Sequence, residues 1–298
     1  MGPNKSSNAL REAIAADRFV IAPGCYDSLG ARLAERHGFP AVYMSGLAVT
    51  ASLLARPDLE LLGMEEMVRQ AGLIASAVNI SVIADADTGY GGLSNVERTT
   101  QAYVQAGVQA IHLEDQASPK RCGHLAGVRL IDEGAMVAKL QVAQEARGDA
   151  DMLIIGRTDA FKVAGLEEAI RRANCYREAG VDVVFVDGVT RAEDFRQVRQ
   201  AVEGPLMASV VEIDAPAQTK ASELKEMGYS IAVFAISGVL AAAGALDRLM
   251  ADIKNYGDTD RSFEGMLTYS GLNQKLGIEH YEDLWNRFSH PEQSGEQS

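Results

Sequence analysis

Cysteine is scarce in this chain: Cys25, Cys122 and Cys175 are three residues among 298. An odd, sparse set in a long chain excludes a disulfide framework, and it predicts a reducing, cytoplasm-like location. Long apolar runs are also lacking, because a stretch such as 239–246 is far shorter than the roughly 20 residues that span a bilayer. We therefore expect no membrane partner.

Positive charge is in the minority. Lys and Arg total 28 against 41 Asp and Glu, so the net charge is -13. This balance excludes a nucleic-acid surface, where basic side chains supply most of the affinity. An acidic small-molecule substrate stays compatible with it, because a few buried cations or a metal ion can reverse the sign locally.

Eight short apolar runs recur along the chain, most of them rich in Val and Ile. Such runs are typical of strands that are buried on both faces in a parallel sheet. They lie at 19–22, 41–44, 81–84, 109–113, 152–155, 182–186, 206–208 and 231–234. The stretches between most of them predict helices, at 27–37, 65–78, 94–106, 134–146, 166–179, 192–202 and 222–227.

Local signals support this alternation. Ser94 and Glu97 predict a capping box at the start of the helix at 94–106. A glycine joins a helix to the next strand at four junctions, at Gly38, Gly107, Gly180 and Gly228.

Eight such strand–helix units and a length of 298 residues predict an α/β fold, a (β/α)8 barrel. The alternative is a doubly wound open sheet, which has fewer strands in this length. No Gly/Pro/Ser-rich linker divides the sequence. We therefore expect one barrel domain over 1–298, with a C-terminal helical extension at about 257–290.

Polar residues follow six of the eight apolar runs. Active sites of such barrels lie at the carboxyl ends of the strands, so these residues are candidates for chemistry. They are Ser45 and Gly46, Asp85 to Gly92, Glu114 to Gln116, Arg157 to Asp159, Asp187, and Ser209 with Glu212. A barrel with a purely structural role would not need this concentration at one mouth.

Asp85, Asp87 and Glu114 form the sharpest cluster. Three converging carboxylates repel one another unless one takes up a proton or a cation joins them. Mg²⁺ prefers carboxylates together with water and substrate oxygens, so the cluster predicts a magnesium site. The alternative is that the two aspartates cap the glycine-rich turn at 89–92.

The loop at 119–124 carries the second signal. Cys122 lies beside Lys120, Arg121 and His124, whose positive charge would stabilise a thiolate. Such a cysteine can act as an acid, a base or a nucleophile. The alternative is a basic surface turn with a chance cysteine.

Arg157 follows the fifth apolar run. An arginine there either forms ion pairs inside the barrel or binds a ligand carboxylate at the mouth, where its planar fork suits bidentate contact. His112 lies within the fourth run, and we interpret it as an interior histidine.

Six segments in this order resemble the isocitrate lyase/phosphoenolpyruvate mutase superfamily over nearly the whole chain. They are GCYDS at 24–28, YMSG at 43–46, ADADTGYG at 84–91, HLEDQ at 112–116, KRCGH at 120–124 and GRTDA at 156–160. The KRCGH loop is similar to that of the carbon–carbon lyase branch, which includes 2-methylisocitrate lyases and 2-alkylmalate or dimethylmalate lyases.

The resemblance implies a Mg²⁺ cofactor, with Mn²⁺ as an alternative, and a homotetramer whose terminal helix is swapped between subunits. It implies that Asp85 and Asp87 bind the metal, with Glu114 and Asp58 acting partly through water. Cys122 would be the acid, on a loop that closes over the substrate.

The resemblance also implies the substrate contacts. Tyr43, Ser45, Gly46 and Leu47 would hold the α-carboxylate end, and Tyr43 or a carboxylate near the metal would be the base. Arg157 would hold a carboxylate or oxyanion, assisted by Lys120 and Arg121. The other candidates at the mouth are Gly123 and His124 in the loop and Asp187 and Ser209 at strand ends.

Four positions depart from the methylisocitrate lyase pattern. Asp187 replaces a glutamate, Ser209 an asparagine, Leu125 an arginine and Ala235 a proline. The missing arginine removes a partner for a third substrate carboxylate. The resemblance therefore predicts a Mg²⁺-dependent lyase of a 2-hydroxy dicarboxylate or tricarboxylate. The alternatives are an oxaloacetate hydrolase or decarboxylase, phosphonopyruvate-type chemistry, and an inactive barrel kept for assembly.

Overall fold

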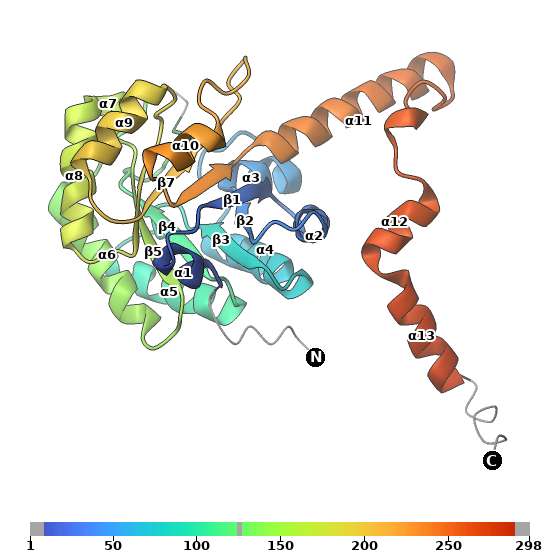
Figure 1. The fold of residues 1–298 in the computed structure, drawn as a ribbon, viewed down its shortest axis with the longest axis horizontal. Helices are drawn as coiled ribbons and strands as arrows, with labels where there is room; N and C mark the ends of the chain where they lie inside the picture. Colours follow the sequence, from blue (N-terminus) through green and yellow to red (C-terminus); the bar gives the residue numbers. More distant parts are fainter. Residues whose placement is uncertain (1–8, 124–126, 290–298) are drawn as a thin grey trace. The chain divides into compact units, whose positions relative to one another are not determined.

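The computed structural model describes residues 9–123 and 127–289, and its centre is a closed barrel of eight parallel strands. The strands follow one another around the ring in chain order, and β1 closes it by pairing with β8. Helices lie outside the ring, between successive strands (Figure 1). The predicted (β/α)8 barrel is confirmed, and the open sheet is excluded because the ring leaves no edge strand among the eight.

The strands coincide with the eight predicted apolar runs, and their ends differ from them by three residues at most. They are β1 Val20–Cys25, β2 Ala41–Met44, β3 Ser81–Asp85, β4 Ala110–Glu114, β5 Leu153–Thr158, β6 Val183–Val186, β7 Leu206–Ser209 and β8 Ile231–Phe234. Their Val and Ile side chains are buried on both faces, against the barrel interior on one side and the helices on the other.

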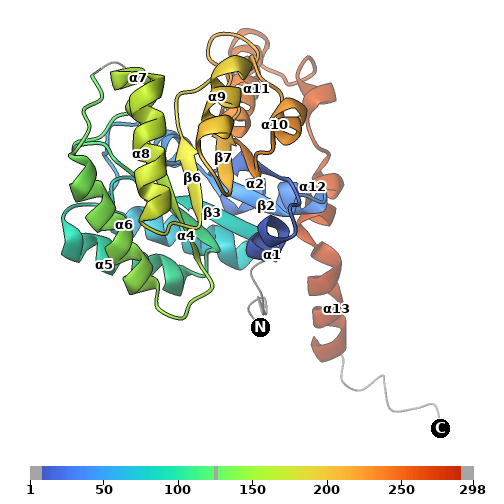
Figure 2. The same cartoon turned by 60° about the vertical axis from the view of Figure 1, so that its left-hand side comes forward.

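The helices of the barrel include all seven predicted between the strands. The barrel helices are α1 Ala9–Ala15, α2 Ser28–Arg36, α3 Gly46–Leu54, α4 Met64–Ala77, α5 Leu93–Ala106, α6 Glu133–Arg147, α7 Ala160–Ala164, α8 Leu166–Glu178, α9 Ala192–Ala201 and α10 Ala221–Met227. Three of them, α1, α3 and α7, are additional to the prediction. Figure 2 shows α8, α9 and α10 covering their side of the barrel.

The predicted capping box at Ser94 is wrong. Helix α5 begins at Leu93, and Gly92 is its N-cap residue. The Asn95 side chain accepts a hydrogen bond from the Gly92 backbone N–H at 3.1 Å. Gly91 has a φ of 142°, which turns the chain into the helix earlier than the Ser94 signal suggested.

The alternation of side chains along each strand decides which residues reach the barrel interior. Strand register places Glu114 beside Arg157 and Arg157 beside Phe185, so all three share the inner face. Asp85 is paired with His112 in the same way. The polar side chains at the strand ends therefore converge above an apolar interior layer.

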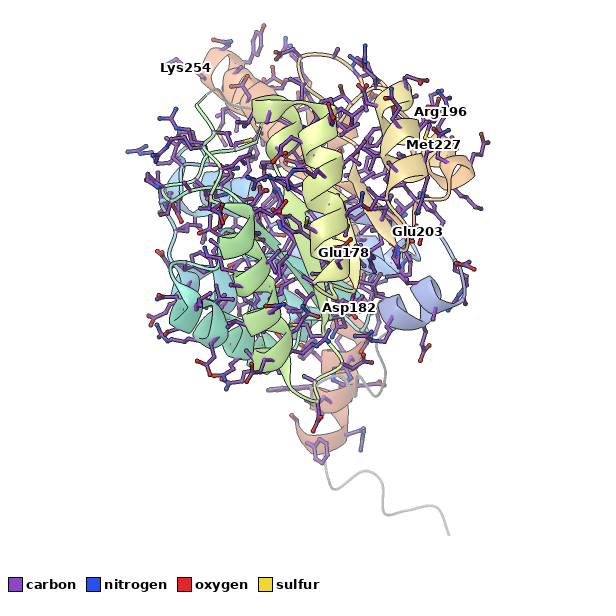
Figure 3. The ribbon with its side chains drawn as sticks, turned by 90° about the vertical axis from the view of Figure 1, so that its left-hand side faces the viewer. Glu178, Asp182, Arg196, Glu203, Met227 and Lys254 are labelled. Atoms are coloured by element: carbon purple, nitrogen blue, oxygen red, sulfur yellow. The ribbon has the colours of Figure 1, made fainter. Side chains whose placement is uncertain are left out.

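The opposite end of the barrel carries a different ion-pair cluster. Asp182, labelled in Figure 3, precedes β6 and accepts hydrogen bonds from the Ile154 backbone N–H at 2.8 Å and from Arg147. Arg11 of α1 donates to the same carboxylate at 2.9 Å. Contacts at this end join α1 and α6 to the strands, and stability is their role in such barrels.

Two compact units divide the chain, Met1–Ala241 and Ala242–Ser298. The second contains most of α11 Ser237–Tyr256, then η1 Phe263–Gly265, α12 Tyr269–Leu276 and α13 Ile278–Ser289. None of its described residues is fully buried. Within residues 9–123 and 127–289, no helix is long and apolar enough to cross a membrane.

Candidate active site

A small cavity lies at the carboxyl ends of the strands, and the structure brings most of the predicted site residues around it. Its volume is about 50 Å³, which holds a few water molecules. The predicted residues that line it are Tyr43, Ser45, Leu47, Asp58, Asp85, Cys122, Gly123, Arg157, Asp187 and Ser209. Phe185, Val211, Ala235 and Ile236 complete the wall.

Other predicted residues lie next to this cavity. Asp87, Glu114 and Lys120 are buried behind its polar wall, and Gly46 donates its backbone N–H to Asp85 at 3.1 Å. His124 lies outside the described residues, as does Leu125.

Three carboxylates surround the Arg157 guanidinium. Its Nε and Nη2 donate to the two oxygens of Asp159 at 3.0 and 2.8 Å, a bidentate pair. Nη2 also donates to Asp187 at 2.7 Å, and Nη1 is 3.3 Å from Glu114. The Phe185 ring lies 5.5 Å from the guanidinium carbon. These contacts fix the plane of the guanidinium.

We call Arg157 together with these carboxylates the Arg157 clamp. Asp115 positions it from the outer side of the barrel. Its carboxylate is fully buried and accepts hydrogen bonds from the Asp159 backbone N–H at 2.9 Å and the Thr158 hydroxyl at 2.7 Å. The Tyr176 hydroxyl and Arg172 also donate to it, at 2.7 and 3.0 Å. The position of Asp159, and through it that of Arg157, is therefore set by helix α8 as well as by the strand.

A second cation, Lys120, sits among the carboxylates. Its ammonium group is 2.6 Å from Asp87 and donates to both oxygens of Asp58 at 2.8 and 2.9 Å. Burial disfavours the ammonium, but Asp87 and the neighbouring carboxylates outweigh this and raise the pKa of Lys120 well above its ordinary value. The loop thus directs Lys120 into the carboxylate cluster.

The site holds more acid groups than these two cations balance. Burial raises the pKa of Asp87 to about 6, and repulsion from Asp85 and Asp58 adds to it despite Lys120. Burial also raises the pKa of Glu114 well above its ordinary value and that of Asp159 to about 6. The cluster therefore favours binding either protons or a further cation.

The residues present fit a hard divalent cation. Glu114 Oε1 is buried without a hydrogen-bond partner among the described residues. Its neighbour Oε2 is 3.3 Å from Arg157, and an Asp87 oxygen is 2.6 Å from the Lys120 ammonium, so these two oxygens already face a cation. Carboxylate oxygens are the ligands that Mg²⁺ prefers, and it usually takes one or two of them together with water. In the described part of the chain no three such side chains already form a direct metal-binding group, so the fit is to a site of few carboxylates and several waters.

Helix α3 points its first turn at the same cavity. Ser45 caps it, accepting from the Ala48 backbone N–H at 3.4 Å. A Cβ atom at Gly46 would lie 2.7 Å from an Asp85 oxygen, so glycine is required for this close approach. The backbone N–H groups of such a turn attract anions.

Tyr43 and His112 form a buried pair on the inner face of the barrel. The Tyr43 hydroxyl and His112 Nε2 share a hydrogen bond of 2.7 Å, and the two rings are stacked. Burial lowers the pKa of His112 to about 4 and raises the pKa of Tyr43 well above its ordinary value. At neutral pH both rings are therefore uncharged, and Tyr43 retains its proton.

Sequence reasoning placed Asp159 at the mouth without a role, and it gave Phe185 none. The position of Asp159 could have indicated an ion pair with Arg157, because Asp159 lies two residues after it, at the end of the same strand. Phe185 carried none beyond its place in an apolar run. The packing of Tyr43 against His112 joins residues 69 positions apart, so no local pattern in the sequence predicts it.

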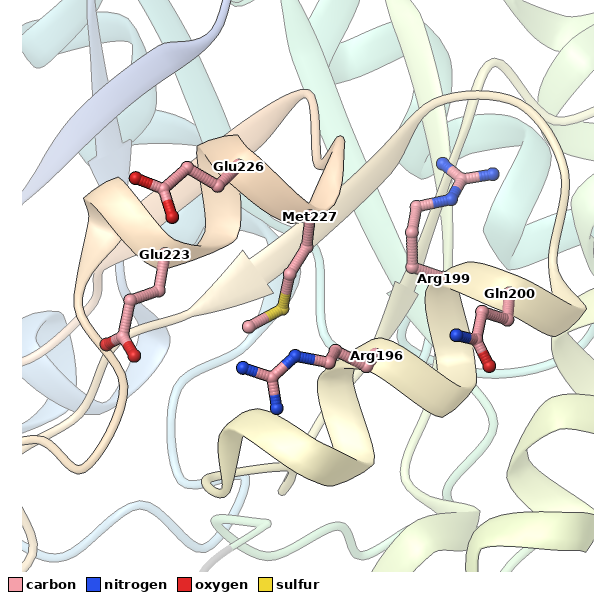
Figure 4. A pocket seen from close by; sticks show the side chains of 6 residues that line it. All are labelled: Arg196, Arg199, Gln200, Glu223, Glu226 and Met227. Atoms are coloured by element: carbon pink, nitrogen blue, oxygen red, sulfur yellow. The ribbon is translucent and has the colours of Figure 1, made fainter.

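Another pocket lies on the outer surface between α9 and α10 (Figure 4). It is lined by Arg196, Arg199, Gln200, Glu223, Glu226 and Met227. Arg199 donates to the carbonyl of Val202, the C-cap residue of α9, and to the Gly204 carbonyl at 2.7 Å, so it holds the end of this helix. None of the predicted site residues belongs to this pocket.

Fold and site together define a (β/α)8 barrel enzyme whose centre is rich in carboxylates and suited to a divalent cation. The family model described as phosphoenolpyruvate phosphomutase matches residues 10–254. The chain belongs to this family, the phosphoenolpyruvate mutase/isocitrate lyase superfamily, as the sequence resemblance predicted.

Curated relatives and solved structures cover almost the entire chain. It is 36% identical to 2,3-dimethylmalate lyase of Eubacterium barkeri, over 94% of this chain and 97% of that one. It is 40% identical to 2-methylisocitrate lyase of Aeropyrum pernix, over 92% and 88%. The structure of oxaloacetate acetylhydrolase with the inhibitor 3,3-difluorooxalacetate is similar with a TM-score of 0.89, 31% identity and coverage of 96% and 98%.

Gly123 places the loop against the Arg157 clamp. A Cβ atom there would lie 2.6 Å from oxygens of both Asp159 and Asp187. We expect Gly123→Ala to displace the loop, because such a steric conflict costs about 1–3 kcal/mol. This cost lowers the ratio of seated to displaced loop by roughly tenfold or more. The measurement is the rate of tryptic cleavage after Arg121, which should rise by that factor.

Gly92→Ala is the matched control, because a Cβ atom at Gly92 meets nothing within 4 Å and its φ is negative. An unchanged cleavage rate in Gly123→Ala would contradict the role of Gly123 in seating the loop.

Proposed function

We propose that this chain is a Mg²⁺-dependent carbon–carbon lyase that cleaves a 2-hydroxy dicarboxylate or tricarboxylate into an α-keto acid and a second carboxylic acid. The observation that carries the proposal is the cavity itself, where Cys122 and Gly123 of one loop face Asp85, Arg157 and the other strand-end groups. The similarity to 2,3-dimethylmalate lyase and 2-methylisocitrate lyase supports the same reaction class.

Asp85 and Asp87 would hold the metal, with Glu114 and Asp58 acting through water. The buried Glu114 Oε1 atom, which has no hydrogen-bond partner among the described residues, supports this assignment, and so does the attraction of the Asp87 carboxylate for the Lys120 cation. A dianionic substrate also needs a further positive charge in a pocket with this many carboxylates. When bound, Mg²⁺ would lower the pKa of the substrate hydroxyl and orient it together with the adjacent carboxylate.

The substrate's α-carboxylate would rest on the first turn of α3, at Ser45, Gly46 and Leu47. An apolar wall supports a substrate with small alkyl groups: Leu47, Phe185, Val211 and Ile236 line the cavity. Among its described lining residues Arg157 is the single cation, which favours a dicarboxylate of the alkylmalate kind over a tricarboxylate.

The chain's own groups would move the protons. A carboxylate near the metal site takes the proton of the substrate hydroxyl, since Tyr43 keeps its own proton at neutral pH, and the electron pair of that O–H bond forms the new carbonyl. The bond between C2 and C3 then breaks, and its electron pair becomes an enediolate on the departing acid. Arg157, held in place by Asp159 and Asp187, stabilises this negative charge; donors of this kind are worth roughly 10²–10³ in rate.

Cys122 would complete the reaction by donating its thiol proton to C3 of the enediolate. The proton taken from the hydroxyl returns to the thiolate after the products leave, so no net water or oxidant is consumed. Bulk water must be excluded until the proton is delivered, which is why the loop has to stay closed during the step.

Oxaloacetate hydrolysis is the second candidate, because the structural similarity to oxaloacetate acetylhydrolase is as extensive as that to the lyases. Mass spectrometry of the products from a panel of 2-hydroxy dicarboxylates and oxaloacetate separates the two. An α-keto acid formed from a 2-hydroxy dicarboxylate identifies the lyase, and acetate with oxalate formed from oxaloacetate identifies the hydrolase.

Replacing the proposed acid tests the mechanism. Cys122→Ser should lower turnover by at least about two orders of magnitude, because a positioned general acid contributes roughly 10²–10⁴. Substrate binding, measured by calorimetry with Mg²⁺ present, should stay close to that of the unaltered chain. Cys175→Ser is the control, since Cys175 lies on α8 away from the cavity lining. Turnover near normal in Cys122→Ser would remove the thiol from the mechanism.

Replacing a proposed ligand tests the metal. Asp87→Asn should weaken Mg²⁺ binding at least about tenfold in a direct calorimetric titration without substrate, because a neutral amide replaces a charged ligand. Asp149→Asn, which alters an exposed aspartate, should leave the titration unchanged. Equal Mg²⁺ affinity in Asp87→Asn and the unaltered chain would show that Asp87 is not a ligand.

We also propose that the C-terminal helices pack on other copies of the chain, as in a helix-swapped homotetramer. Large aromatic side chains there are exposed, with fractions of 86% for Tyr269, 69% for Trp285 and 68% for Phe288. Exposed apolar surface of this kind marks an interface.

Sedimentation velocity tests this assembly. The full chain should sediment as a tetramer, and Trp285→Asp should shift it toward smaller species, because burying a carboxylate at an apolar contact is costly. Glu282→Ala, on the same exposed helix, serves as the control. A full chain that sediments as a monomer at micromolar concentration would rule the assembly out.

A further inference from the structure

The loop that carries Cys122 rests on a short segment after α3, where Asp58 and Glu60 contact it. The Glu60 carboxylate accepts hydrogen bonds from the Lys120 backbone N–H and from the Ser118 hydroxyl, both at 2.7 Å. Two residues earlier, the Asp58 carbonyl accepts from the Cys122 backbone N–H at 3.1 Å. Residues 58–60 thus hold the loop on both sides of Lys120.

Glu60 also contacts the glycine-rich loop that follows β3. Its second carboxylate oxygen accepts from the Thr88 hydroxyl at 3.4 Å. The Thr88 carbonyl in turn accepts from Lys139 of α6 at 2.8 Å. One half-buried carboxylate therefore joins three loops at the rim of the cavity, while the Lys120 ammonium is bound by Asp58 and Asp87 instead.

The backbone of Glu60 is strained. Its φ is 58°, in the left-handed region that glycine adopts freely and other residues adopt at a cost. Glycine would relieve the strain but could make none of the three side-chain hydrogen bonds. A glutamate in this conformation is therefore explained by the contacts of its carboxylate rather than by the turn.

We infer that Glu60 is a positioning residue that latches the Cys122 loop in its closed conformation. It touches neither Cys122 nor the cavity lining, and it acts by binding the loop two residues before the thiol. The inference rests on the proposed function only in giving Cys122 the role of the acid. The latch itself is a property of the loop and can be measured without substrate.

The test is the reactivity of the Cys122 thiol toward iodoacetamide, with the modified peptide identified by mass spectrometry. In Glu60→Gly the strain disappears together with the carboxylate, so a folding defect is not expected. We expect alkylation of Cys122 to become roughly tenfold faster, because loss of charge-assisted hydrogen bonds shifts the loop toward its open form. kcat/KM should fall by a similar factor while the melting temperature does not decrease.

Two variants complete the comparison. Ser118→Ala removes one of the three side-chain contacts and should give a smaller increase in reactivity. Glu65 lies a few residues after Glu60, and its exposed carboxylate pairs with Arg98. Glu65→Gln should leave the rate of Cys122 alkylation unchanged. A Cys122 rate in Glu60→Gly equal to that of the unaltered chain would overturn the latch.

The outcomes separate the latch from the proposed reaction. Faster alkylation in Glu60→Gly combined with full activity of Cys122→Ser would support the latch and remove the thiol from catalysis. Unchanged alkylation in Glu60→Gly combined with an inactive Cys122→Ser would overturn the latch and support the thiol as the acid.

Discussion

The balance of buried charge at the carboxyl ends of the strands is the constraint on which the site depends. Carboxylates from β3, β4 and the loops after β5 and β6 are removed from water there, and each unpaired one carries a large penalty. Arg157, on the barrel wall, offsets part of this penalty, and Lys120, on the loop, offsets another part. The raised pKa values of Asp87 and Glu114 show that the balance is incomplete, which is the physical basis for expecting a further cation.

The same constraint couples the loop to the barrel. With the loop in its observed position, Lys120 contacts Asp58 and Asp87 while Cys122 lines the cavity, so one loop supplies both a cation to the cluster and the thiol to the cavity. Gly123 permits the close approach, since any side chain would meet the Arg157 clamp. Glu60 adds hydrogen bonds outside the cluster, so the loop is held by more than the ion pairs of Lys120.

Much of the barrel was predictable, because its signals are local. Parallel strands buried on both faces must be apolar along their length, and glycines such as Gly107 and Gly228 end helices in the left-handed conformation. Helix α3 was missed because it follows β2 directly and most of its residues are apolar. The start of α5 was misplaced because Ser94 gave a stronger sequence signal than Gly92, the actual cap.

By itself, the sequence determined the strand order, the family and the residues at the strand ends, since each apolar run and its carboxyl end are readable from neighbouring positions. Only the tertiary structure decided which of these residues meet. Glu60 finds Lys120 60 positions away and Asp115 finds Tyr176 61 positions away, and no local pattern encodes such pairs. Barrel closure brings them together, because it fixes the register of every strand and thereby the direction in which each terminal side chain points.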